Sequence, residues 1–220
     1  MRRRLAALAV PVLLVLAGCT ATTGPQDAAA GPERGRPTRP SPFADCATLT
    51  APPATPVASG SAGAGDGGGT PGSPAPADDG SRLPELVLSC FTGGSPVALR
   101  DIRGPAVINV WASWCPPCRK ELPAFQRLSV RAAGQLQVIG VNSRDSRDGA
   151  QAIGEDFGIR FPVLFDQGEA LQRELRRSAV PLTLLVDAQG RVRHTDTSGA
   201  LDDARLADLV RRHLGLAVPA

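Results

Sequence analysis

The chain has 220 residues, of which 24 are basic and 21 acidic, for a formal net charge of +3. Three of the basic residues, Arg2, Arg3 and Arg4, belong to the N-terminal export signal described below, which we expect to be cleaved off. Without them the chain has 21 basic against 21 acidic residues. A formally neutral chain has no basic excess to neutralise phosphates, so we expect no nucleic-acid partner.

The N-terminus has the pattern of an export signal. The three arginines precede an apolar run from Leu5 to Leu16 that is too short to span a bilayer permanently. Leu16-Ala17-Gly18-Cys19 resembles a bacterial lipobox, in which cleavage precedes the cysteine and that cysteine carries the lipid. We therefore expect residues 1–18 to be a lipoprotein signal peptide and Cys19 the lipidated residue. The alternative is a plain secretory signal in which Cys19 is incidental.

A long segment rich in small residues and proline follows the signal. Such a composition cannot bury enough apolar surface to offset the entropy lost on ordering. We predict that residues 19–82 are a disordered Pro/Gly/Ala-rich tether and that residues 83–220 form one domain. The tether holds one island, Pro42–Leu49, which contains an aromatic residue and Cys46.

Strand-like and helix-like segments alternate through the predicted domain, which predicts an α/β fold that ends in an antiparallel hairpin. We expect strands at 85–91, 96–99, 105–111, 137–142, 161–166, 181–186 and 192–197. We expect helices from Cys118 to Gly134 and at 146–157, 169–177 and 202–214.

Two cysteines fall at a junction between a predicted strand and a predicted helix. Cys115-Pro116-Pro117-Cys118 follows the apolar run that ends at Val110 by a few residues. The free amides and positive dipole end of a helix N-terminus favour a thiolate, and a thiolate attacks disulfides. Cys118, one helical turn on, is close enough to close a ring onto Cys115 after a mixed disulfide has formed.

Two further cysteines remain if Cys19 is lipidated and Cys115 pairs with Cys118. These are Cys46, in the tether island, and Cys90, in the first predicted strand. In an exported protein we expect them to form a structural disulfide, which would shorten the free tether to about 26 residues. The alternative is two unpaired or resolving thiols.

The stretch Val-Ile-Asn-Val-Trp-Ala-Ser-Trp-Cys-Pro-Pro-Cys-Arg-Lys-Glu-Leu-Pro, residues 107–123, resembles the TlpA/ResA-like family of membrane-anchored thiol-disulfide oxidoreductases. The resemblance covers about residues 83–215. It implies a thioredoxin fold: a central mixed sheet flanked by helices, here with an N-terminal β-hairpin extension. Cys115 would be the attacking cysteine and Cys118 the resolving one. Pro181 would be a cis-proline that faces the active site, an assignment compatible with the X-Pro preference for cis bonds.

The same resemblance assigns the remaining site residues. Glu121 matches an active-site glutamate, which could relay the proton of Cys118 or oppose thiolate formation by charge repulsion. The alternative for Glu121 is a first-turn helix acid favoured by the helix dipole. We assign substrate binding to four residues around the cysteines: Trp114, Pro116, Pro117 and Val180.

We expect a disulfide reductase that needs no cofactor and is lipid-anchored on the outer face of the bacterial cytoplasmic membrane. Pro116 and Pro117 delete two potential donors to the thiolate, which favours the disulfide form and hence a reductant. The resemblance implies electrons from a membrane dithiol donor and protein disulfide substrates such as the haem-site cysteines of apocytochrome c.

Two other functions compete. A copper-delivery metallochaperone of the same fold would combine His194 with Cys115 and Cys118, but the histidine is more simply a surface residue of an edge strand, and we predict no metal site. A thiol peroxidase would place a threonine a few residues before a lone reactive cysteine, where this chain has Ala-Ser-Trp at 112–114.

Overall fold

The computed structural model describes residues 39–50 and 80–219. The predicted signal peptide, Cys19 and most of the predicted tether lie outside the described residues. In the part of the chain that is described, no helix combines the length and apolar character needed to cross a membrane.

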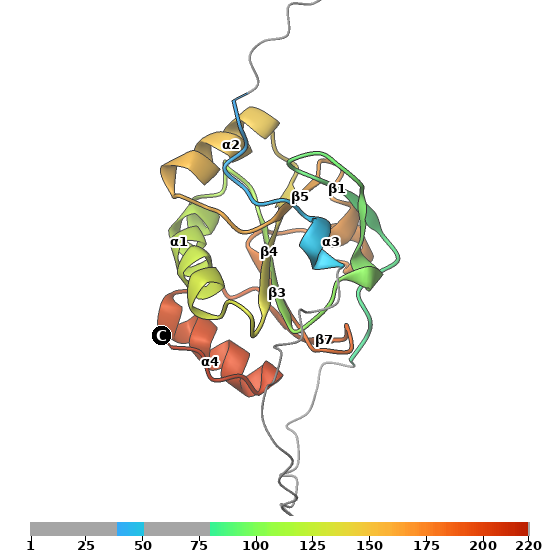
Figure 1. Ribbon diagram of the computed structural model, residues 1–220, viewed down its shortest axis with the longest axis vertical. Helices are drawn as coiled ribbons and strands as arrows, with labels where there is room; N and C mark the ends of the chain where they lie inside the picture. Colours follow the sequence, from blue (N-terminus) through green and yellow to red (C-terminus); the bar gives the residue numbers. More distant parts are fainter. Residues whose placement is uncertain (1–38, 51–79, 220) are drawn as a thin grey trace, which may run out of the picture. The chain divides into compact units, whose positions relative to one another are not determined.

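A seven-stranded sheet with the order β2-β1-β5-β4-β3-β6-β7 forms the centre of the domain (Figure 1). Strands β3, β4 and β5 run parallel to one another, whereas β1 and β6 pair antiparallel with β5 and β3, respectively. The antiparallel pairs β1–β2 and β6–β7 lie at the two edges. The strands are β1 (Val87–Cys90), β2 (Val97–Ala98), β3 (Ala106–Trp111), β4 (Gln137–Ser143), β5 (Val163–Asp166), β6 (Leu182–Val186) and β7 (Val192–Asp196).

The six residues of β3 are all buried, because the sheet carries helices on both faces. The side chains of β3 alternate between two apolar layers, as strand geometry requires. Val107 and Trp111 pack in one layer with α1 (Pro116–Arg131) and α4 (Asp203–Leu214), whereas Ile108 packs in the other. Figure 1 shows α1 and α4 on the same side of β3 and β4.

The second layer contains shorter helices. Leu171 of α3 (Ala170–Glu174) packs there, as do Leu49 of the 3₁₀ helix η1 (Ala47–Leu49) and Leu99 of η2 (Leu99–Asp101). The mixed sheet, the flanking helices and the β1–β2 hairpin confirm the predicted fold class.

One predicted helix is shorter than expected. The sequence predicts a helix over 169–177, whereas α3 spans Ala170–Glu174. Glu169 and Arg176 have φ angles of 55° and 52°, in the left-handed region that a right-handed helix cannot include. The helix α2 (Arg147–Asp156) agrees with its prediction, and its N-cap Ser146 accepts a hydrogen bond from Gly149 N at 3.0 Å.

Residues 39–50, which we call the N-terminal strap, pack against the domain. Phe43 is 5% exposed, with its ring centroid 4.8 Å from that of Phe91. Cys46 and Cys90 form a disulfide with a Cα–Cα distance of 5.9 Å. Ala44 N donates to the carbonyl oxygen of Arg160 at 3.0 Å. This part of the predicted tether is ordered because it supplies the apolar side chains that the surrounding composition lacks.

Candidate active site

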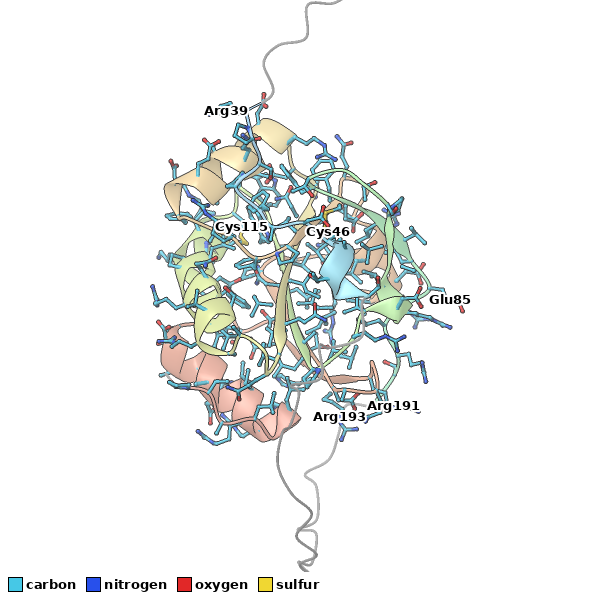
Figure 2. The ribbon with its side chains drawn as sticks, in the orientation of Figure 1. Arg39, Cys46, Glu85, Cys115, Arg191 and Arg193 are labelled. Carbon is cyan, nitrogen blue, oxygen red and sulfur yellow. A yellow bond between two sulfur atoms is a disulfide. The ribbon has the colours of Figure 1, made fainter. Side chains whose placement is uncertain are left out.

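Cys115 and Cys118 lie at the N-terminal end of α1 and form a disulfide with a Cα–Cα distance of 5.3 Å (Figure 2). Cys115 is the N-cap residue, and its Sγ accepts a hydrogen bond from Cys118 N at 3.2 Å. Cys115 is 2% exposed and Cys118 is fully buried. Both cysteines are therefore buried in the disulfide form, and of the two only Cys115 has any exposed surface.

The bond between Val180 and Pro181 is cis, and the sheet brings it beside the cysteines. Leu182 of β6 is paired with Val110 of β3. The two strands are antiparallel, so the residues before Leu182 lie next to those that follow Val110, where the loop to Cys115 begins. Pro181 is buried, and Val180 is partly exposed.

The two tryptophans have different environments. Trp111 is fully buried, with its ring centroid 6.3 Å from that of Phe43. Trp114 is 55% exposed, and its Nε1 donates to the carbonyl oxygen of Arg144 at 2.8 Å. With Pro116 exposed and Pro117 half-buried, Trp114 gives the rim of the disulfide an apolar surface fixed in orientation by one hydrogen bond.

Glu121 is fully buried on α1, three residues after Cys118 and so on the same side of the helix. Its Oε1 accepts from Asn109 Nδ2 at 2.6 Å, and its Oε2 accepts from Leu201 N at 3.1 Å. Burial raises the pKa of Glu121 to about 7, although both hydrogen bonds oppose this shift; the negative charge of Asp196 adds to it. The first turn of α1 contains no acid, so the first-turn alternative for Glu121 is wrong.

Asp145, in the loop after β4, binds the loop that carries Cys115. The sequence did not predict this contact. Asp145 Oδ2 accepts from Ser113 N at 2.5 Å, and Asp145 Oδ1 accepts from Ser113 Oγ at 2.7 Å. The available signal was topological: Asp145 follows the strand parallel to β3, and the carboxyl ends of parallel neighbours meet at one edge of a sheet.

His194 does not form the trio with Cys115 and Cys118 that the competing metallochaperone function would need. It lies on β7, where its ring stacks on that of His213 with a centroid distance of 4.0 Å. Across residues 39–50 and 80–219, no group of three or more His, Cys, Asp or Glu side chains is arranged to hold a metal ion.

Comparison with known proteins agrees with this geometry. The model of the AhpC/TSA family matches residues 80–195. Thioredoxin-like protein YneN of Bacillus subtilis (strain 168) is 30% identical over 116 residues, which are 51% of this chain and 67% of YneN. Thiol-disulfide oxidoreductase ResA of the same organism is 32% identical over 117 residues, 52% of this chain and 64% of ResA. The chain thus spans about two thirds of the length of these curated relatives.

Among solved structures, a secreted thiol-disulfide isomerase from Corynebacterium glutamicum superposes with a TM-score of 0.52 at 25% identity. The match covers 66% of this chain and 96% of the isomerase. The thioredoxin fold and the resemblance to ResA-like proteins are therefore confirmed. With its family model matched over more than half its length, the chain belongs to the AhpC/TSA family, as a thioredoxin-fold member similar to the ResA thiol-disulfide oxidoreductases.

Proposed function

We propose that this protein is a membrane-anchored, extracytoplasmic disulfide reductase whose reactive group is the Cys115/Cys118 dithiol. The observation that carries the proposal is the placement of this pair at the start of α1, beside the cis bond at Val180–Pro181, with some exposed surface on Cys115 and none on Cys118. A cysteine at the helix N-cap, next to the exposed Trp114 and Pro116 and bonded to a fully buried partner, suits a two-step exchange.

In the first step the Cys115 thiolate attacks one sulfur of a substrate disulfide. The substrate S–S bond breaks, a mixed disulfide forms, and the released substrate thiolate takes up a proton. In the second step Cys118 loses its proton and attacks Cys115 Sγ, which releases the second substrate thiolate. Two electrons pass to the substrate, and the enzyme is left with the disulfide seen in the structure.

Glu121 is the group that we assign to the proton of Cys118. It lies three residues further along the same helix, and its pKa of about 7 lets it exist in both protonation states at neutral pH. Its buried oxygens accept hydrogen bonds from Asn109 and Leu201, so the carboxyl group keeps a fixed position on α1.

The rim beside Cys115 is the surface that we assign to substrate binding. Trp114 and Pro116 are exposed, while Pro117 and Val180 are partly exposed. An apolar rim of this kind accepts an extended polypeptide around its cystine without selecting a charged sequence. We assign protein disulfides as the substrate class, with apocytochrome c as the first candidate on the strength of the family resemblance.

The donors around Cys115 support the reducing direction. Pro116 and Pro117 have no amide hydrogen, and the hydrogen bond to Cys115 Sγ comes from Cys118 N at 3.2 Å. A thiolate with few donors is poorly stabilised, which favours the disulfide form and lowers the reduction potential. A membrane dithiol would then restore the reduced enzyme by the same exchange, and lipidation at Cys19 would keep the domain near it.

The decisive experiment is a redox titration of the Cys115/Cys118 couple against dithiothreitol and glutathione buffers, together with an insulin reduction assay. We expect a potential below about −200 mV, in the range of reducing thioredoxin-fold proteins. A potential near about −120 mV, typical of a strong oxidant, would overturn the reducing assignment.

A further inference from the structure

The loop that carries Cys115 is anchored from the neighbouring strand by one carboxylate. Asp145, 8% exposed, follows the end of β4. It accepts hydrogen bonds from both the amide and the hydroxyl of Ser113, at 2.5 and 2.7 Å. Ser113 precedes Cys115 by two residues, so this carboxylate binds the loop that carries the reactive sulfur.

Asp145 is surrounded by donors on its other sides as well. Asn142 Nδ2 donates to Oδ2 at 2.8 Å, and Ser146 N donates to Oδ1 at 2.8 Å. The site is also closely packed, because a Cβ atom at Gly149 would lie 2.6 Å from Ser113 Oγ and 3.4 Å from Asp145 Oδ1. Four donors directed at two oxygens form a site built for an anion.

This arrangement acts on Cys115 in two ways that have the same sign. The hydroxyl and amide of Ser113 donate to Asp145 and are therefore not available to a thiolate at Cys115. In addition, a buried negative charge near the loop disfavours a second negative charge on the sulfur. Both effects destabilise the reduced, ionised form relative to the disulfide.

We propose that Asp145 is a positioning residue that keeps the Cys115/Cys118 couple reducing, by withholding the Ser113 donors from Cys115 and by placing a negative charge behind the loop. The proposal rests on the proposed function only in requiring that this cysteine pair cycles between dithiol and disulfide.

The test is the equilibrium of the full chain with glutathione, measured for the wild type and for Asp145→Asn. We expect the equilibrium constant for reduction by glutathione to rise about tenfold in Asp145→Asn, which for a two-electron couple is about 30 mV towards a more oxidising potential. If this variant does not fold, Asp145→Ser serves instead, because it keeps one acceptor oxygen and removes the charge.

Two further variants separate this role from a purely structural one. Asp187→Asn is the matched control: Asp187 Oδ1 also accepts two backbone amides, from Gln189 and Arg191 at 2.9 Å each, but in the turn between β6 and β7. Its equilibrium constant is expected to stay within twofold of the wild type. Ser113→Ala loosens the same loop but keeps the carboxylate, and it too is expected to stay within twofold.

An unchanged equilibrium constant in the Asp145 variants would overturn the proposal. An equal rise in Ser113→Ala would also overturn it, because loop order and not the carboxylate would then set the potential. The proposed direction of electron flow is judged separately, by the wild-type potential itself.

Discussion

Asn109 Nδ2 lies 2.6 Å from Glu121 Oε1, and neither side chain has any exposed surface. The amide supplies one of two donors to a carboxyl group that is otherwise enclosed in the apolar layer between α1 and the sheet. Because burial outweighs these donors, the fold favours the neutral form of Glu121, with a pKa of about 7 against an ordinary value of 4.5.

We expect this raised pKa to make the protein less stable as the pH rises. Below about pH 4.5 Glu121 is protonated in both the folded and the unfolded chain and carries no penalty. Between 4.5 and about 7 the unfolded chain ionises first, so stability falls by on the order of 3 kcal/mol. Urea unfolding of the wild type and Glu121→Gln at pH 4.5 and 7.5 checks this, since the variant should lack that part of the loss. An identical pH dependence in both proteins would contradict it.

Glu121→Gln should also slow the release of substrate. The glutamine cannot take the proton of Cys118, so we expect the second exchange step to be slowed by about 100-fold at neutral pH. Stopped-flow measurement of mixed-disulfide decay reports that step. Glu155→Gln is the control, because Glu155 lies on the surface of α2 and pairs with Arg39; a similar loss in both variants would argue against proton transfer by Glu121.

Replacing the two cysteines should have different consequences. Cys115→Ser removes the attacking sulfur, and we expect it to abolish insulin reduction and to form no adduct. Cys118→Ser keeps the attacking sulfur but removes the resolving one, so it should accumulate mixed disulfides with substrate. Mass spectrometry after alkylation distinguishes the two results, and sustained turnover by either variant would exclude the dithiol mechanism.

The N-terminal strap should stabilise the domain without taking part in the exchange. Replacing both Cys46 and Cys90 by serine opens a cross-link between positions 44 residues apart, and we expect a loss of about 2–5 kcal/mol. Phe43→Ala should cost about 3–5 kcal/mol, because the ring is buried against Phe91. Denaturant unfolding measures both losses. Both the double serine variant and Phe43→Ala, where folded, should still reduce insulin. An inactive but folded variant would mean that the strap also shapes the active site.

Gly149 offers a test of how closely the loops pack. A methyl group there would meet Ser113 Oγ at 2.6 Å, so Gly149→Ala should destabilise the protein by about 1–3 kcal/mol. Gly168→Ala is the matched control, since a Cβ at Gly168 would have no heavy atom within 4 Å apart from its own residue and its two chain neighbours. Thermal unfolding of the two variants gives the comparison, and equal melting temperatures would contradict the packing seen around Ser113.

The features that follow from local sequence were predictable. Cys115 and Cys118 at a helix N-terminus, the order of strands and helices, and the disulfide between Cys46 and Cys90 all follow from short-range patterns and from the number of cysteines. The bond between Asp145 and Ser113 was not predicted, because it joins residues 32 positions apart and depends on two parallel strands ending together.

The structure differs from the sequence-based predictions at two other places, the strap and α3, and both differences have local physical causes that composition does not reveal. The strap is ordered by Phe43 and Cys46, whose contacts with the domain outweigh the disorder-promoting residues around them. The end of α3 is set by the left-handed conformation of Arg176, which residue type alone does not reveal.

The disulfide of the strap places a condition on how this protein matures. If the Cys115/Cys118 pair is a reductant, it does not itself oxidise Cys46 and Cys90, so that bond must be made by another oxidant. One cystine of the molecule then holds the strap to the domain, while the other, at the start of α1, would open and close in each cycle of the proposed exchange.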